Sequence, residues 1–374
     1  MRKSEELLFK LIRLALGTES DLTLPMDADW QEVLDLAKKH GVAAIAYDGL
    51  QKPYEGLDDD AFLTSLDQDA NEDLRYRWFG AMMSVEKNYA GHVKTLARLG
   101  ALYREAGIPT MLLKGYGLAG DWPVPNHRPP GDINIYQFGR WREGDGLVAA
   151  RTGAVISNHH HHHSVFHFGK TMVENHYDFL NVHSHRSTRW IEKYLKALAA
   201  DAEVVDGTGF LLPSADFNAC FVMRHAAVHF AAEWVVLRQL VDWAMFVRCH
   251  HSEVDWNRVW QFYEKANMHE FVLCIDEICI RNLGMQRKIF HIPEKFSYFY
   301  TQRVSLVDRV LNDILKPCGL NESNDTSTYV GGRLKLWWGN RWKHRIVYSD
   351  SLFVTFLYQT ISHMMKPATL KRQR

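Results

Sequence analysis

The spacing of apolar residues changes twice along the chain and divides it into three parts. In residues 1–107 apolar positions recur every three to four residues, as in helices with one buried face. Residues 108–186 instead hold short apolar runs of strand length, and helical spacing returns in residues 187–374. We therefore expect a helix-rich α+β protein, in which a small mixed β-sheet core is flanked by N- and C-terminal helical regions.

Helix-end signals are clear in the first part. Apolar residues recur at helical spacing from Leu7 onward and stop before Gly17, a residue type that commonly ends helices. Asp29 precedes the next stretch as a candidate N-cap, and Gly41 follows it. Few helix breakers occur from Asp59 to Ala106, so one or two long helices are expected there. None of these helices suggests chemistry, and we expect them to pack against the middle part.

Short strand-like runs characterise the middle part. They are Met111–Leu113, Ile133–Tyr136, Ala154–Ser157, Ser164–Phe168 and Thr171–Phe179. Gly169-Lys170 separates the last two, which indicates a two-residue hairpin turn. A helix is expected from Trp141 to Arg151. Because about 80 residues make a small domain, the flanking helices are needed to cover this sheet.

Helices are expected again in the third part. The first runs from Ser187 to Ala200, and a loop with a helix cap follows at Leu212–Asp216. The later helical stretches are Phe217–Cys249, Trp256–Leu283 and Pro293–Leu315. The polar segment Gly319–Gly332 contains several glycines and is expected to be a loop.

Composition narrows the class of protein. Lys plus Arg and Asp plus Glu both number 44, so bulk charge does not favour coating nucleic acid. The five cysteines form no C-x-x-C pair and lie in apolar surroundings, which favours buried thiols in a reducing compartment. The charged N-terminus differs from a signal peptide, and Leu352–Met365 is too short and polar to span a bilayer. We expect a cytoplasmic protein without a membrane segment.

Polar residues gather on the predicted strands in a pattern that suits nucleotidyl transfer. They are Lys114 and Gly115 after the first strand, Asp132 and Asn134 on the second, and Glu174, His176 and Asp178 on a later one. Residues two apart on a strand share a face. Transfer requires a triphosphate to be held while the negative charge that develops on its phosphates is neutralised. Divalent ions, bridged by carboxylates, usually provide this neutralisation. A glycine turn before a helix offers N–H groups to phosphates.

The order of three motifs, L-L-K-G, R-P-P-G-D-I-N and V-E-N-H, resembles a bacterial nucleotidyltransferase-like family. That family belongs to the superfamily of the DNA polymerase β-type palm, and its pattern is L-K-G, R-x-x-G-D-I-D and a strand ending E-x-H. The segments W-Q-E-V-L-D-L-A-K-K-H-G-V and L-R-Q-L-V-D-W-A are also similar, so the resemblance covers most of the chain. Each motif is short, and the specificity lies in their combination.

The resemblance implies Mg²⁺- or Mn²⁺-assisted transfer, by two metal ions, of a nucleoside monophosphate from a nucleoside triphosphate to a hydroxyl. The acceptor stays open among a small molecule, a protein side chain and an RNA end. The implied catalytic residues and metal ligands are Asp132, Asn134 and Glu174. The implied nucleotide-binding residues are Lys114, Gly115, Arg128 and His176. Arg128 would either neutralise phosphate charge or brace its loop.

Asn134 departs from the family pattern, which has aspartate at this position. An amide oxygen can coordinate a cation but adds no negative charge, so metal affinity and phosphoryl-charge neutralisation should both decrease. Three explanations stay open: an engineered substitution that traps a substrate, a natural loss of activity, or compensation by Asp178. The alternative to an enzyme is therefore a catalytically inactive nucleotide-binding or interaction protein of the same fold.

Histidines suggest a further alternative, a His-rich metal protein. On a strand the five consecutive residues His159–His163 cannot all face one ion, which favours a solvated loop or strand edge. His225 and His229 have the spacing of helical metal ligands but lack the glutamate of H-E-x-x-H, which favours a packing role. The basic, Trp-containing run Lys335–Arg345 is expected to dock on the core while its charges reach the surface.

Overall fold

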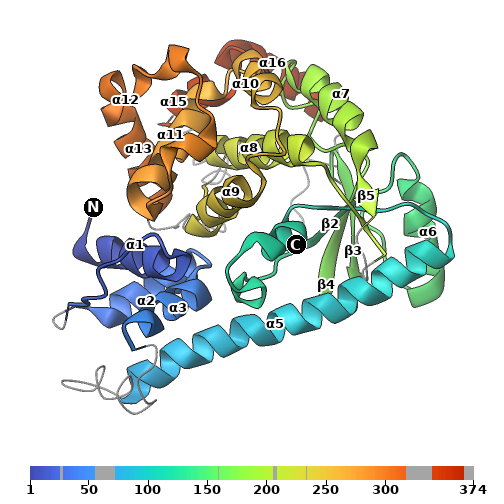
Figure 1. The fold of residues 1–374 in the computed structure, drawn as a ribbon. Coiled ribbons are helices and arrows are strands. Elements are labelled where there is room, and N and C mark those ends of the chain that lie inside the picture. Colours follow the sequence, from blue (N-terminus) through green and yellow to red (C-terminus); the bar gives the residue numbers. More distant parts are fainter. Residues whose placement is uncertain are drawn as a thin grey trace, which may run out of the picture.

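The computed structural model describes residues 1–25, 28–54, 72–158, 160–204, 209–232, 234–316 and 339–365. Helices form most of the protein, and one mixed sheet lies among them (Figure 1). This confirms the predicted helix-rich α+β class. None of the helices in the described ranges is both long enough and apolar enough to span a membrane.

The N-terminal elements are α1 (Lys3–Leu16), α2 (Trp30–Lys39), α3 (Ala43–Gln51), the 3-10 turn η1 (Lys52–Tyr54) and α5 (Glu72–Glu105). Helices α1, α2 and α5 end close to the predicted positions, whereas α3 and η1 were not predicted as separate elements. Gly17 ends α1 in the left-handed conformation, with φ of 68°. Asp29 caps α2, because its carboxylate accepts a hydrogen bond from the Glu32 N–H at 2.9 Å. Of the predicted helical stretch Asp59–Ala106, residues 59–71 lie outside the described ranges.

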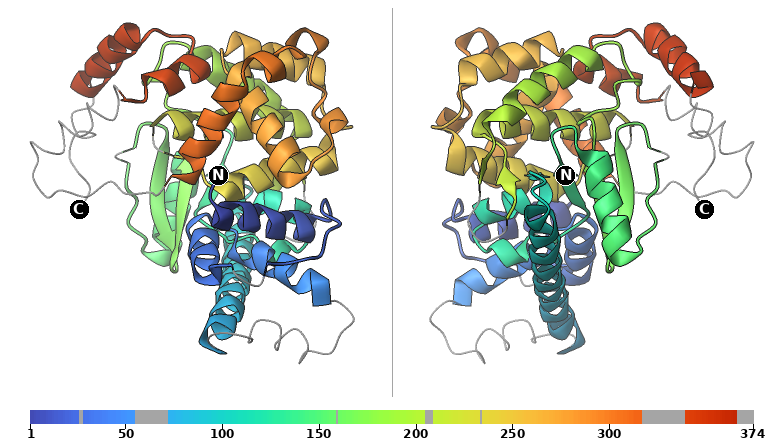
Figure 2. Two further views of the ribbon diagram at one scale, coloured as in Figure 1. Left: turned by 90° about the vertical axis from the view of Figure 1, so that its left-hand side faces the viewer. Right: turned by 90° about the vertical axis from the view of Figure 1, so that its right-hand side faces the viewer.

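Helix α5 packs against both the N-terminal helices and the sheet. Its 34 residues make it about 50 Å long. It packs against α2 and α3 near its start and against the sheet near its end. Figure 1 shows it running past both groups of elements, and Figure 2 shows it nearly along its axis.

The sheet has six strands in the order β3-β4-β2-β1-β6-β5. The strands are β1 (Met111–Leu113), β2 (Ile133–Tyr136), β3 (His163–Phe168), β4 (Thr171–His176), β5 (Glu203–Val204) and β6 (Leu211–Leu212). The pairs β2/β4 and β1/β6 are parallel, and the other pairs are antiparallel. Gly169 and Lys170 form the predicted turn of the β3/β4 hairpin.

Two strand predictions were wrong in detail, and two strands were not predicted. Ala154–Ser157 is not a strand, since only Ser157 pairs there, through two hydrogen bonds to Val165. The strand predicted over Thr171–Phe179 ends at His176. Strands β5 and β6 were missed, because two residues each are too few to show alternation.

The remaining elements are mostly helices around the sheet. They are η2 (Gly115–Asp121), η3 (Pro125–His127), α6 (Trp141–Thr152), α7 (Thr188–Leu198), η4 (Ala199–Asp201), α8 (Ala215–Ala232), α9 (Leu237–His250), α10 (Trp256–Lys265), α11 (His269–Leu283), η5 (Arg287–Phe290), η6 (Glu294–Phe296), α12 (Phe299–Gln302), α13 (Val304–Leu315), α15 (Arg341–Val347) and α16 (Leu352–Met365). The stretch Phe217–Cys249 is thus divided between α8 and α9. Trp256–Leu283 is divided as well, by Asn267 with φ of 56°.

Two expectations about exposure need correction. Three cysteines are buried as expected, but Cys249 is exposed. Residues 335–338 of the basic run Lys335–Arg345 lie outside the described ranges, and so does the predicted loop Gly319–Gly332. The described end of that run docks on the core through Trp342, which packs on Phe230. Lys343 does not reach the surface, because it is buried beside Asp313.

Alternation along the strands gives the sheet two different faces. On one face Ile133, Ile135 and Val173 pack with residues of α5, including Leu99 and Tyr103. The neighbouring positions on β2 and β4 point to the opposite face. That second face carries the predicted chemistry, and α8 and α9 lie beyond it (Figure 1).

Candidate active site

The end of strand β1 places a cation beside the predicted acidic strand. Lys114 and Gly115 both have positive φ angles, of 38° and 52°, so the chain turns sharply into η2. The Lys114 Nζ atom lies 4.0 Å from a carboxylate oxygen of Asp132. It also lies 2.9 Å from Nε2 of His225 on α8.

His225 serves as an acceptor for this lysine. Burial, reinforced by Lys114 and His229, holds the pKa of His225 well below its usual range, so its ring is neutral. An ammonium only donates, and the Nε2 atom of His225 therefore accepts. The expected packing role is thus accompanied by a polar one, which orients Lys114.

Sheet register brings the three predicted metal ligands to one face. Asp132 precedes β2, and Asn134 lies within it. In the parallel pair of β2 and β4, Asn134 is directly opposite Glu174, so both side chains lie on the same face. Asp132, Asn134 and Glu174 are therefore neighbours, although Glu174 is some forty residues later in the chain.

The Asn134 amide connects two of its neighbours. Its Nδ2 atom donates to a carboxylate oxygen of Asp132 at 2.8 Å. Its Oδ1 atom lies 3.1 Å from Nε2 of His176, and the Nδ1 atom of that ring lies 3.2 Å from the Asp178 carbonyl oxygen. Each nitrogen of His176 thus faces an acceptor. An aspartate at position 134 could not donate to Asp132, and the two carboxylates would repel each other.

Glu174 is ionised despite being largely buried. Burial opposes its negative charge, but the hydrogen bond from His176 and the nearby His163 and Lys114 outweigh that effect. Together they hold the pKa of Glu174 well below its usual range. Its two oxygens lie 3.7 Å from Nε2 of His163 and 3.5 Å from Nε2 of His176.

Arg128 forms a buried ion pair rather than an open phosphate contact. Its Nε and Nη2 atoms donate to the two carboxylate oxygens of Asp242 on α9, at 2.7 and 2.9 Å. The Trp122 indole N–H donates to the same carboxylate at 2.9 Å. The contacts fix the loop between η2 and β2 against α9.

A pocket opens between this loop, the sheet and the helices. Leucine, valine and methionine side chains of α8 and α9 form part of its wall, and its polar lining residues are Lys114, Arg128, Asp132, Asn134, His225, Arg238, Gln239 and Asp242. Arg238 donates through Nη1 to the Pro129 carbonyl oxygen at 3.3 Å. Within the described ranges its buried Nε atom has no hydrogen-bond partner. A bound anion would satisfy that donor.

Arg238 and Asp242 were not among the predicted site residues, although a signal for them existed. Both lie in the segment L-R-Q-L-V-D-W-A, which was quoted for its family resemblance and assigned no role. Two charged residues four apart lie on one face of a helix, and here they interrupt a largely apolar segment.

Asp178 is not on the face that was expected. Strand β4 ends at His176, and the Asp178 carboxylate pairs with Lys196 of α7. It does not stand beside Asn134, so compensation by Asp178 loses its geometric basis.

The histidine tract lies at the edge strand β3, one of the two predicted alternatives, and its described residues are half-buried or buried. His160–His162 form a bend, and His163 begins the strand. His163 is only 6% exposed. His159 lies outside the described ranges.

A family model described as an uncharacterised nucleotidyltransferase matches residues 26–284. The chain belongs to this family. The match confirms the resemblance, and its range includes every residue of the pocket described above. Neither the curated proteins nor the solved structures that were searched gave a match. Within the nucleotidyltransferase family, a role in nucleotidyl transfer is the general function, and a nucleotide is the implied substrate.

Proposed function

We propose that the protein transfers a nucleoside monophosphate from a nucleoside triphosphate to a hydroxyl acceptor, with divalent metal ions and release of pyrophosphate. One observation carries the proposal beyond family membership. Asp132, Asn134 and Glu174 share one sheet face, and Lys114 lies 4.0 Å from Asp132 at the mouth of a pocket. Acidic groups for metal and basic groups for phosphate are thus adjacent.

Oxygen donors for a hard cation are available in this arrangement. Asp132 and Glu174 would hold Mg²⁺ or Mn²⁺ through carboxylate oxygens, and the Oδ1 atom of Asn134 would complete the set after leaving His176. Such ions polarise the phosphate and stabilise the leaving pyrophosphate. The low pKa of Glu174 supports this role, because the carboxylate is ionised and ready to bind.

Phosphate binding is assigned to two basic residues of the pocket and to the turn at Gly115. Lys114 and Arg238 would contact the triphosphate, and the turn at Gly115 would bring backbone N–H groups close to it. Arg128 is already paired with Asp242 and is proposed as a positioning residue, which braces the loop before Asp132. Uncharged Asn134 reduces the negative charge of the metal set, so we expect slow transfer.

Nucleotide binding tests the assignment. We would measure Mg²⁺-dependent binding of nucleoside triphosphates by calorimetry for the natural chain and for Lys114→Ala and Arg238→Ala. Each substitution should weaken binding about tenfold or more, which equals about 1.4 kcal/mol. Lys170→Ala, in the exposed β3/β4 turn, is the control and should bind normally.

Two results would contradict the proposal. One is an absence of nucleotide binding by the natural chain. The other is unchanged binding by Lys114→Ala and Arg238→Ala. Binding without any transfer, even after Asn134→Asp, would instead favour a nucleotide-binding protein that is not an enzyme.

A further inference from the structure

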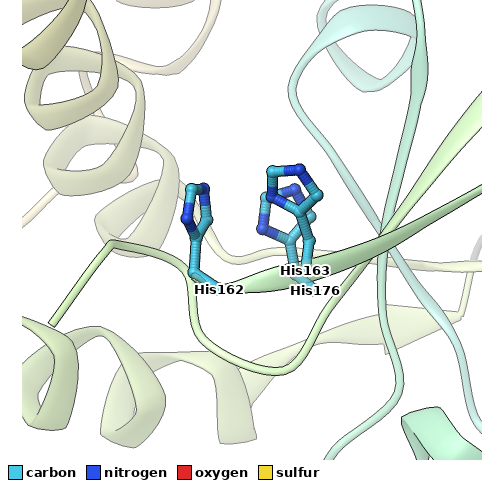
Figure 3. A group of neighbouring side chains, drawn as sticks. All are labelled: His162, His163 and His176. Atoms are coloured by element: carbon cyan, nitrogen blue, oxygen red, sulfur yellow. The ribbon is translucent and has the colours of Figure 1, made fainter. Parts of the chain in front are cut away.

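Three histidines converge beside the proposed active site. His162, His163 and His176 each offer one ring nitrogen, and these nitrogens all lie within 4.8 Å of one another (Figure 3). His163 and His176 are opposite each other in the antiparallel pair of β3 and β4. His162 lies in the bend before β3, so the alternation of a strand does not turn it away from His163.

Glu174 completes a possible ligand set. Its Oε1 atom lies 3.7 Å from Nε2 of His163, and its Oε2 atom lies 3.5 Å from Nε2 of His176. Ligand atoms around a tetrahedral zinc ion are about 3.3 Å apart, given metal–ligand bonds of about 2.0 Å. The two Glu174 spacings are close to this value, whereas the ring nitrogens, which lie within 4.8 Å of one another, would move closer together around a bound ion.

Two ring nitrogens of the cluster lack a competing hydrogen bond. The Nδ1 atoms of His162 and His163 are buried and have no hydrogen-bond partner in the described part of the chain. A metal ion bound at an unprotonated ring nitrogen would satisfy such an atom.

We propose that His162, His163, His176 and Glu174 bind one transition-metal ion of the zinc class. Imidazole nitrogens suit zinc and its neighbours in the periodic table, whereas Mg²⁺ prefers oxygen ligands. The site is distinct from the proposed magnesium set but shares Glu174 with it. His162, His163 and His176 lie outside the proposed magnesium set, so metal binding at this site does not require nucleotide transfer.

Metal titration of the full chain tests this site. The protein, purified without a nickel column and treated with a chelator, would be titrated with Co²⁺ and then with Zn²⁺. We expect one Co²⁺ per chain with the strong visible absorption of four-coordinate cobalt, which Zn²⁺ then removes. Losing an outer-shell partner alone costs about 10- to 100-fold in metal affinity, so His162→Ala and His163→Ala should each cost about 100-fold or more.

Two control variants separate the site from non-specific chelation. His167→Ala removes an exposed histidine of the same strand, and His161→Ala removes a residue of the same tract. Both should keep the cobalt spectrum and the zinc affinity. A His163→Gln variant, checked by circular dichroism without metal, guards against a folding defect in His163→Ala. Zinc affinity that is unchanged in both cluster variants, or lost equally in His161→Ala, would overturn the proposal.

Discussion

The Asn134 amide contacts Asp132 through its nitrogen and His176 through its oxygen. It donates to Asp132 and faces His176 with its oxygen. Without a bound cation, this bridge satisfies both neighbours, as an aspartate could not. Asn134 therefore stabilises the site without a metal ion. It also lacks the negative charge of an aspartate, which would favour metal binding and transfer.

The Arg128–Asp242 pair is the second residue-scale feature with a measurable consequence. Both side chains are about 95% buried, at 6% and 5% exposure. Removing one partner leaves an uncompensated buried charge, so Arg128→Ala or Asp242→Ala should lower the free energy of unfolding by about 3–5 kcal/mol. Urea denaturation would measure this loss.

An exposed ion pair provides the control for that prediction. Arg281 and Asp308 are 42% and 47% exposed, and Asp308→Ala should cost about 1 kcal/mol or less. A loss in Asp242→Ala as small as that in Asp308→Ala would show that Asp242 does not brace the loop.

At the scale of elements, helices α1 and α3 cross so closely that only glycine fits at position 49. A Cβ atom on Gly49 would lie 1.8 Å from the backbone oxygen of Leu11. Backbone cannot rotate away as a side chain can, so Gly49→Ala should separate the helices and cost about 1–3 kcal/mol or more. Gly80→Ala in α5 meets nothing within 4 Å and should instead stabilise the protein by about 0.5–1 kcal/mol.

Both glycine variants can be compared by urea denaturation at one pH. Equal unfolding free energies for Gly49→Ala and the natural chain would contradict the close crossing of α1 and α3.

The end of α9 is tied to η2 by a pH-dependent contact. His250 lies 2.9 Å from Asp121, and this hydrogen bond, aided by Glu253, raises the pKa of His250 to about 9 despite burial. Below its ordinary value of 6.5, His250 is protonated in the folded and unfolded states, so the full stabilisation is present. As pH rises through 9, the folded state also loses the proton, and this stabilisation disappears.

The matching experiment compares the natural chain with His250→Gln at two pH values. The difference in unfolding free energy should be larger near pH 6 than near pH 10. His167→Gln, which replaces an exposed histidine, should show no such dependence. The same difference for His250→Gln at both pH values would exclude this contact as a source of pH dependence.

Elements with strong local signals could be predicted from the sequence. Gly17 and Asp29 mark helix ends by their backbone preference and capping chemistry, and both boundaries were correct. The strand β6 could not be predicted, because Leu211 pairs with Met111 about one hundred residues earlier and has no periodicity of its own. Likewise, the break between α8 and α9 lies in residues that include no Gly or Pro and so give no strong helix-end signal.

At the scale of the whole molecule, the candidate site depends on contacts between distant segments. The motif order predicted Lys114, Asp132, Asn134 and Glu174 as site residues, because short motifs carry them. The same reasoning did not show that Arg238 lines the pocket, and it did not show that His163 is buried. Both depend on the tertiary packing of elements far apart in sequence, which local patterns do not encode.

The central claim is nucleotidyl transfer at Asp132, Asn134 and Glu174. Its most direct test is Mg²⁺-dependent transfer of label from an α-labelled nucleoside triphosphate, with RNA, proteins and small hydroxyl compounds offered together as acceptors. The account predicts that Asn134→Asp transfers label about tenfold faster or more than the natural chain, a gain of about 1.4 kcal/mol in the barrier. Adding Asp132→Asn to that variant should abolish transfer. Absence of transfer by Asn134→Asp, or transfer that survives the loss of Asp132, would contradict it.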